Sequence, residues 1–211
     1  MMSAMDPPLH ERVYEGLKED YLAGHFVPGK KIDIQELATR HRSSKTPVRE
    51  AAFIMVGEGL FTHHADGGFL VPVLEPADLI DLLGWHMQIM LSLLTNLREA
   101  AVRNALQQGT LAHDGLSPVS VANQATNIFA SLASATGNRT ATSEVRRLND
   151  RLHYSRIADA TNPVAHRREL ATIASLRAVN LLKAVRRRIE AYHLRKIDHQ
   201  RKITIIGSSQ E

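Results

Sequence analysis

The segment PGKKIDIQELATRHRSSKTPVREAAFIMVGEGLF, residues 28–61, decides the fold class. After its Pro-Gly turn, Asp33 precedes an apolar-periodic run with Glu36 three residues further on, which is the pattern of a capped helix start. RSSK interrupts that run, and Pro47 falls in the first turn of a second helix, where its missing N–H costs no hydrogen bond. The segment therefore predicts two short helices joined by a tight turn.

The flanking residues extend this pattern in both directions. Upstream, residues 10–23 place Val13, Leu17 and Tyr21 on one helical face, and Gly24 follows as a C-terminal cap. Downstream, two short apolar runs at 60–62 and 69–73 surround Asp66-Gly67-Gly68, the signal of a β-hairpin. Helix, helix, turn, helix and hairpin, in this order, predict a winged helix-turn-helix with the hairpin as its wing.

Beyond Val73 the strand signals end, and Pro76 begins a series of helical patterns. We expect helices near 77–107, 118–136, 143–160 and 165–197, the last with a break near 179–180. The predicted fold is mainly α, a winged helix-turn-helix followed by an all-α helical bundle. The predicted divisions are a flexible arm (1–8), a DNA-binding domain (9–74), an effector-binding and dimerisation domain (75–202) and a C-terminal tail (203–211).

The composition excludes several chemistries. The 211 residues include no cysteine, so disulfides, thiolate metal sites and cysteine nucleophiles are excluded, and a reducing, cytoplasmic setting is expected. The first residues do not have the pattern of a secretory signal. The apolar stretch 79–97 contains Asp81, His86 and Gln88, so we expect a buried helix there and no membrane span.

The charge distribution does not by itself predict DNA binding. The net charge is +4, yet residues 1–74 contain eight Lys and Arg against ten Asp and Glu, and the remainder contains 18 against 12. The prediction depends instead on where individual basic residues fall.

Residues 28–60 resemble the DNA-binding signature of GntR-type bacterial regulators. That signature has P-G, then E-L-A, then S-R-T-P-V-R-E-A-L, then E-G-L. The corresponding residues here are Pro28-Gly29, Glu36-Leu37-Ala38, the run Ser44–Ala52 and Glu58-Gly59-Leu60. The resemblance covers 33 of the 211 residues, in matching order and spacing.

The helical remainder is similar to the ligand-sensing (FCD) domain of the FadR subgroup, whose members are usually homodimers that bind small carboxylates, often through a metal. The family's D-x-x-F-H is here Thr126-x-x-Phe129-Ala130, and its E-H-x-x-I is Glu169-Leu170-x-x-Ile173. Only Tyr192 or His193 falls near the last family histidine. Because hydroxyl and apolar groups are poor metal ligands, we expect no bound metal or other cofactor. The expected effector is a carboxylate with an apolar or aromatic portion.

The candidate DNA contacts surround the start of the third helix. Lys45 and Arg49 lie four residues apart and project from one face; Arg49 can pair with guanine O6 and N7, and Lys45 can reach a phosphate or a guanine. A solvated charged face is the alternative. The remaining candidates are residues of the second helix, the turn, the start of the third helix and the wing: Gln35, Arg42, Ser44, Thr46, Pro47, His64, Asp66 and Gly67.

Several of these residues have a second interpretation. Ser44 and Thr46 can bind phosphate or cap the helix, and Gln35 can be an ordinary surface residue. Arg42 stands where the family prefers a turn glycine. The arginine adds a basic group, and its side chain disfavours the backbone conformation that a glycine would adopt in this turn. Asp66 is expected to form the turn at the wing tip, and the adjacent His63 and His64 to face opposite sides of a strand.

The candidate effector residues are aromatic, histidine and amide side chains on the helices that surround the ligand in similar domains: Trp85, His86, Asn127, Phe129, His153, Tyr192 and His193. Plain core or dimer packing is the alternative interpretation of Trp85, His86 and their neighbours. The basic run Arg186-Arg187-Arg188 is expected to be a solvated face.

These features predict a homodimeric transcription regulator, a repressor in the commoner case. It would bind a roughly palindromic double-stranded operator, with affinity modulated by a small-molecule effector. The chain contains no paired carboxylates, nucleophile elbow or phosphate loop, so an enzyme is not expected. The alternative is a winged-helix module that binds another protein and not DNA.

Overall fold

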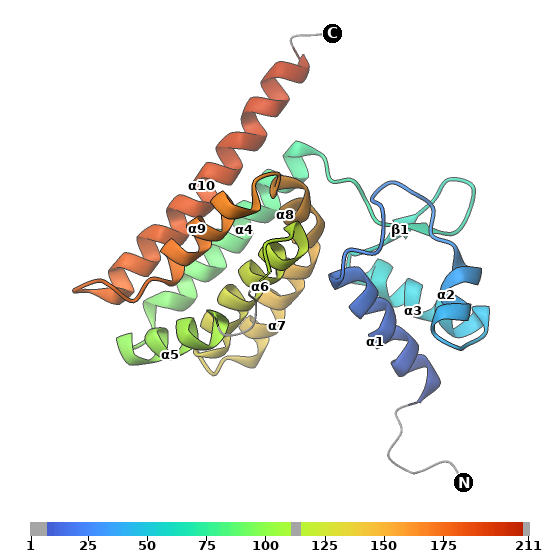
Figure 1. Ribbon diagram of the computed structural model, residues 1–211, viewed down its shortest axis with the longest axis horizontal. Coiled ribbons are helices and arrows are strands. Elements are labelled where there is room, and N and C mark those ends of the chain that lie inside the picture. The colour runs from blue at the N-terminus through green and yellow to red at the C-terminus, as the bar shows by residue number, and fades with distance from the viewer. Residues whose placement is uncertain (1–7, 111–114, 209–211) are drawn as a thin grey trace. The chain divides into compact units, whose positions relative to one another are not determined.

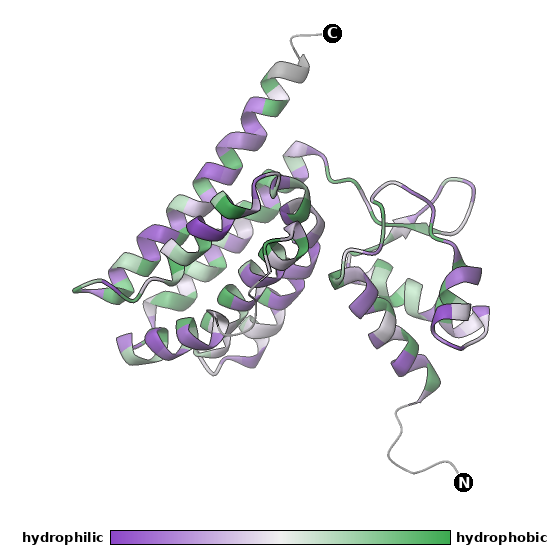
Figure 2. Cartoon of the chain, in the orientation of Figure 1, coloured by the Kyte–Doolittle hydropathy of each residue, from purple (hydrophilic) through white to green (hydrophobic). Residues whose placement is uncertain are grey.

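The computed structural model describes residues 8–110 and 115–208, the last three by their backbone alone. It divides into two compact units, one ending at Val73 and the other beginning at Leu74 (Figure 1). Helices are amphipathic in both, with apolar and polar residues alternating along the ribbons (Figure 2). The predicted arm lies almost entirely outside the described residues, as do residues 209–211 of the predicted tail.

The N-terminal unit has the predicted winged helix-turn-helix order. Its helices are α1 (Leu9–Leu22), α2 (Ile34–Arg40) and α3 (Lys45–Gly57), followed by β1 (Thr62–His63) and β2 (Phe69–Leu70). The two strands pair antiparallel with Thr62 opposite Leu70 and His63 opposite Phe69. A further bridge joins Lys31 to Leu70, so the segment before α2 borders the wing.

The core of this unit forms where α1 packs on α3. The predicted face of α1, Val13, Leu17 and Tyr21, is buried, and so are Val48 and Met55 of α3. A helix this short is stable mainly through such packing of its apolar face, so this contact fixes the direction in which α3 leaves the core.

Helix α2 is held by its cap and by Asp20. The Oδ1 atom of Asp33 accepts hydrogen bonds from the N–H groups of Gln35 (2.7 Å) and Glu36 (3.1 Å), which confirms the predicted cap. Asp20 on α1 accepts from Arg40 Nη1 at 3.2 Å and lies 3.0 Å from His41 Nε2. Burial raises the pKa of Asp20, but the hydrogen bonds of the neighbouring histidines and the Arg40 charge outweigh it and hold that pKa below its usual value.

The second unit is an all-helical bundle, as predicted. Its elements are α4 (Pro76–Thr95), α5 (Glu99–Thr110), α6 (Pro118–Ser134), α7 (Arg139–Arg151), α8 (His153–Asp159), α9 (Pro163–Ala174) and α10 (Leu181–Ser208). Helix α6 contacts α4, α5, α7, α8 and α9, and is therefore the central helix. Its Ile128, Phe129 and Leu132 are fully buried.

Three predicted helix boundaries in this unit were wrong. The helix expected over 77–107 is two helices, because α4 ends at Thr95 and α5 begins at Glu99, with the buried Leu97 between them. The helix expected over 143–160 is two helices that meet at the fully buried Leu152. Residues 203–208, expected in the tail, continue α10, because no glycine or proline interrupts that helix before Gly207.

Helix α4 is the one helix in the described part of the chain that is long and apolar enough to cross a membrane by length and composition. The core helix of a soluble protein passes the same test. Its Leu79, Leu83, Met90 and Leu94 are buried, and it packs along α10. Packing within the bundle thus accounts for the buried part of its apolar surface.

Candidate functional site

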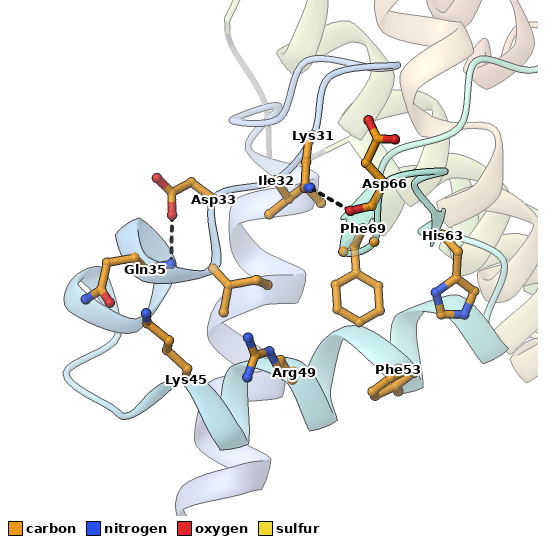
Figure 3. A pocket seen from close by; sticks show the side chains of 13 residues that line it. Lys31, Ile32, Asp33, Gln35, Lys45, Arg49, Phe53, His63, Asp66 and Phe69 are labelled. Carbon is orange, nitrogen blue, oxygen red and sulfur yellow. Dashed lines mark hydrogen bonds between the residues drawn. The ribbon is translucent and has the colours of Figure 1, made fainter.

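A groove of about 670 Å³ lies between the start of α2, one face of α3 and the wing (Figure 3). Lys45 and Arg49 line it from α3, and both side chains are exposed. Because they are four residues apart, they project from the same face of the helix, as predicted. The other lining residues are Lys31, Ile32, Asp33, Ile34, Gln35, Phe53, His63, Asp66, Gly67, Gly68 and Phe69.

Gln35 enters the groove from the first turn of α2. Its backbone N–H is held by Asp33, and its exposed side chain lies beside Lys45 in the close view (Figure 3). The Asp33 carboxylate, as the N-cap of α2, accepts hydrogen bonds from the backbone N–H groups of Gln35 and Glu36. Lys45, Arg49 and Gln35 therefore offer amide and cationic donors at one end of the groove.

The wing supplies the opposite wall. The Nζ atom of Lys31 donates to the backbone carbonyl of Asp66 at 3.3 Å, and the backbone N–H of Asp66 donates to His64 Nδ1 at 3.1 Å (Figure 3 shows the former). Gly67 and Gly68 have φ angles of 79° and 92°, a region that non-glycine residues rarely adopt. These contacts hold the tip in a tight turn with Asp66 and Gly67 exposed.

An aromatic contact closes the groove at the far end of α3. The Phe53 ring meets Phe69 edge to face, with centroids 5.1 Å apart, and lies 5.8 Å from the His63 ring. Phe53 is nevertheless 56% exposed. His63 joins this contact, whereas His64 lies one residue beyond β1, and its Nδ1 accepts from the Asp66 N–H at the wing tip.

The turn residues differ from one another in accessibility. Ser44 is the N-cap residue of α3 but makes no side-chain capping bond, so its exposed hydroxyl remains available, and Thr46 is exposed beside it. Pro47 is buried, because it packs in the first turn of α3, and so it presents no side chain to a ligand. Arg42 has a φ of 49°, the only positive φ of a non-glycine residue in the described ranges.

Arg42→Gly is expected to raise the free energy of unfolding of the N-terminal domain by about 0.5–1 kcal/mol. A left-handed φ costs an L-residue about 1–2 kcal/mol, and the greater freedom of glycine in the unfolded chain offsets part of the gain. Thermal unfolding followed by circular dichroism measures the change. Arg42→Ala removes the same charge but keeps the strained φ, so it should give no comparable gain; equal gains would assign the effect to charge.

The N-terminal geometry matches a known family. The profile of "bacterial regulatory proteins, gntR family" matches residues 9–71, which span all three helices and the wing. The N-terminal domain is a GntR-family helix-turn-helix domain. Residues 9–71 therefore carry the helix pair and wing of that family, with Lys45 and Arg49 at the start of the second helix of the pair.

Other comparisons extend the likeness. The chain is 40% identical over 86 residues to the Nta operon transcriptional regulator of Aminobacter aminovorans, covering 41% of this chain and 37% of that relative's length. A GntR transcriptional regulator from Rhodococcus sp. RHA1 has a similar structure (TM-score 0.75, 17% identity, 90% of this chain and 96% of that one). So does McbR/YncC of E. coli (TM-score 0.71, 17% identity, 94% and 100%). These two likenesses show a shared fold, a winged helix-turn-helix domain followed by a helical domain.

In the helical domain, four predicted effector residues come together in a buried ring cluster: His86 of α4, Phe129 of α6, and Tyr192 and His193 of α10. The His86 ring lies edge to face with Phe129 at 4.9 Å, and Phe129 lies 5.7 Å from Tyr192 and 5.5 Å from His193. Trp85, 50% exposed on α4, and the half-buried Asn127 are outside this set of ring contacts. His153 is buried and meets Tyr154 edge to face, with ring centroids 5.8 Å apart.

The two histidines of the ring cluster form one hydrogen-bonded chain. His193 Nδ1 lies 2.7 Å from the Ile189 carbonyl, which can only accept, so this nitrogen donates and Nε2 is the acceptor in the neutral ring. His86 Nδ1, 2.7 Å from His193 Nε2, is then the donor between the rings. Burial lowers the pKa of His193 to about 4, and burial together with the His193 and Arg156 charges places the pKa of His86 well below its usual value.

A buried arginine adjoins the ring cluster. Arg156 of α8 donates through Nη1 to Thr126 Oγ1 at 3.2 Å and through Nη2 to Asn149 Oδ1 at 2.9 Å. Its guanidinium also lies 5.5 Å from the centroid of the Phe129 ring, a cation–π distance.

A metal of the family type does not fit this arrangement. Thr126, which the FadR-type resemblance places at an Asp position, is hydrogen-bonded to a guanidinium, and Leu170, which it places at a His position, is apolar and buried. A divalent cation placed beside Arg156 would meet a like charge and lack imidazole or carboxylate ligands from these positions.

Sequence reasoning missed Lys31, Phe53 and Arg156. A signal for Lys31 was present, since a basic residue two positions after the Pro28-Gly29 turn falls where the chain returns to the wing. Phe53 lies one turn beyond Arg49 on the same helix face. Arg156 could have been noticed as an arginine on a short helix whose neighbours Leu152 and Ala160 are apolar.

Proposed function

We propose that the chain is a sequence-specific DNA-binding transcription regulator. The supporting observation is the exposed Lys45–Arg49 end of α3, which opens into the groove beside the wing of a GntR-family domain. In helix-turn-helix proteins the start of the second helix contacts base edges in the major groove. The proposed parts are a DNA-binding domain over 9–74 and an effector and dimerisation domain over 75–202, of the FadR (FCD) type.

The proposed base contact is Arg49, whose planar guanidinium can donate two parallel hydrogen bonds to guanine O6 and N7. Lys45 contacts a guanine or a phosphate, and Lys31, held against the wing tip, adds a phosphate contact. The wing tip approaches the minor groove through the backbone around Gly67, because Asp66 itself would repel phosphate. The supporting polar contacts are Gln35, Arg42, Ser44, Thr46 and His64; Pro47 is left out because it is buried.

In this proposal the protein is a cytoplasmic homodimer that binds a roughly palindromic operator, since a two-fold symmetric dimer contacts two symmetric half-sites. A small molecule bound in the helical domain changes operator affinity, and repression is the proposed outcome. The named relatives support regulation of transcription and not catalysis.

Arg49→Ala is expected to weaken binding to a selected operator duplex by about 1–3 kcal/mol, roughly 5-fold to 150-fold, because a bidentate guanine contact is lost. Fluorescence anisotropy with a labelled duplex measures the dissociation constant at several salt concentrations. Lys45→Ala should reduce the salt dependence by about one unit of slope if that residue contacts a phosphate.

The matched control is Arg12→Ala, which removes an exposed arginine of α1 outside the groove. It should leave affinity within twofold of the wild type. If Arg49→Ala binds the operator as tightly as Arg12→Ala does, the proposed role of α3 is wrong. If the wild type binds no duplex at any salt concentration, a protein-binding winged helix is favoured.

A further inference from the structure

A notch on α1, formed by Gly16 and Asp20, holds the side chain of His41. Gly16 and Asp20 are four residues apart and therefore lie on one face of the helix. The Nε2 atom of His41 lies 3.0 Å from Oδ2 of Asp20. A Cβ atom at position 16 would lie 2.6 Å from Nδ1 and 2.8 Å from Cε1 of the same ring. Only glycine therefore leaves room for the His41 ring in this place.

The Asp20 carboxylate binds two further groups. Its Oδ1 atom lies 3.0 Å from His25 Nδ1, and its Oδ2 atom accepts from Arg40 Nη1 at 3.2 Å. Burial raises the pKa of Asp20, but the hydrogen bonds of the two histidines and the Arg40 charge keep this pKa below its usual value, so Asp20 is ionised at neutral pH. A carboxylate only accepts hydrogen bonds, so His41 donates to it through Nε2. The side chains of Asp20 and His41 are only 11% and 15% exposed, so salt screens their contact little.

His41 is also the first residue of the turn between α2 and α3. It is the C-cap residue of α2, and Ser44, three residues later, is the N-cap residue of α3. Between them, the Ser43 N–H donates to the Ala38 carbonyl at 2.9 Å, which folds the turn back onto the end of α2. A connection this short transmits a displacement of His41 to the start of α3.

Helix α1 holds the other end of α3 as well. Glu58, the C-cap residue of α3, accepts from the Tyr14 hydroxyl at 2.5 Å and from Lys18 Nζ at 2.8 Å. Between these two attachments, α3 packs on α1 through buried residues. The His41 contact belongs to the end of α3 that carries Lys45 and Arg49, so it bears directly on the candidate DNA contacts.

We propose that Asp20 and His41 are positioning residues for the DNA contacts of α3. Through the turn they set the direction of the first turn of α3, and so the place where the Arg49 guanidinium meets a base. Both residues are outside the set that lines the groove, and neither is proposed to touch DNA. A bidentate base contact depends on this geometry, whereas phosphate contacts depend mainly on charge, so the notch determines how well the operator is distinguished from other DNA. The proposal rests on the proposed function in one respect, that α3 is the helix that contacts the operator.

The first test uses Gly16→Ala and His41→Ala in the full chain, made singly and together. Binding to the selected operator duplex and to a scrambled duplex of the same length is measured by fluorescence anisotropy at one salt concentration. Gly16→Ala displaces the ring and His41→Ala removes it. Each is expected to lower operator affinity by about fivefold or more, the lower end of the cost of losing a bidentate base contact, and to change affinity for the scrambled duplex by less than about twofold.

The double variant gives the decisive comparison. Once the ring is gone, no other atom lies closer than 3.6 Å to the methyl group at position 16, so Gly16→Ala should cause no further loss of operator affinity. It should instead raise the unfolding temperature relative to His41→Ala, because alanine is a better helix former than glycine. Losses of operator affinity that multiply in the double variant, or a Gly16→Ala protein that binds the operator as tightly as the wild type, overturn the proposal.

Asp20→Ala tests the carboxylate, with Glu19→Ala as the matched control, because Glu19 is an exposed acid of the same helix. Both substitutions remove one negative charge, but only Asp20→Ala is expected to lower operator affinity by about fivefold or more relative to the scrambled duplex. Equal effects of the two variants overturn the proposal. If Asp20→Ala does not fold, as judged by circular dichroism, the Gly16 and His41 variants decide the question alone.

The scrambled duplex separates positioning from a general role in the fold. A folded Gly16→Ala protein that loses affinity for both duplexes by the same factor overturns the proposal. A wild type that does not prefer the operator contradicts the proposed function, and this proposal with it. A wild type that prefers the operator, with the same preference in Gly16→Ala, contradicts only the role of the notch.

Discussion

Phe129→Ala is expected to lower the free energy of unfolding of the helical domain by about 3–5 kcal/mol, the range for truncating a buried aromatic ring. Phe129 is fully buried on the central helix α6 and contacts His86, Tyr192 and His193 of the ring cluster. The substitution removes the ring that contacts these groups and the Arg156 guanidinium, and the surrounding helices close such a cavity only in part.

Trp85 makes the measurement specific to one domain, because it is the only tryptophan and lies on α4. Denaturant unfolding followed by its fluorescence reports the helical domain. Leu116→Ala, a truncation at an exposed position, should change stability by less than about 0.5 kcal/mol. A Phe129→Ala effect as small as that of Leu116→Ala would show that the ring cluster is not part of the core.

Acidification from pH 6.5 to about 4 is expected to destabilise the helical domain by on the order of 3 kcal/mol through His193 alone. In the unfolded chain this histidine binds a proton near pH 6.5, but in the folded domain it does so only near pH 4. Between these values the unfolded state binds more protons, so stability is present above pH 6.5 and is lost as pH falls through the folded pKa. His86, whose pKa is also lowered by burial, adds to the loss.

The slope of unfolding free energy against pH, measured with Trp85 fluorescence, gives the number of protons taken up on unfolding. His193→Phe should flatten the slope between pH 6.5 and 4, while His199→Gln, at an exposed position, should leave it unchanged. A wild-type slope near zero in this interval would contradict the neutral, buried histidine pair.

The N-terminal fold was predictable because local signals agreed with one another. The Asp33 cap, Pro47 in a first turn and the paired glycines of the wing each favour one backbone conformation, and together they leave one order of elements. Arg42 departs from this agreement, because an arginine occupies a left-handed turn position, where its backbone N–H donates to the Thr39 carbonyl at 3.2 Å.

The all-helical class of the second domain was predictable, but its helix boundaries and the buried charge of Arg156 were not. Leu97 and Leu152 end helices because they are buried, and burial depends on contacts between helices distant in sequence. Four residues of the ring cluster were named as candidates from the sequence, but their contacts with one another were not predicted. These residues are His86, Phe129, Tyr192 and His193. Arg156 could not be assigned to their surroundings, because its partners Thr126 and Asn149 are on other helices.

Selection of bound sequences from a pool of random duplex DNA, with the purified full chain, tests the central claim most directly. If the protein is a regulator with two symmetric recognition helices, we expect enrichment of a roughly palindromic motif. Arg49→Ala should lose this enrichment and Arg12→Ala should keep it. Failure of the wild type to enrich any motif, or enrichment of the same motif by Arg49→Ala, would contradict it.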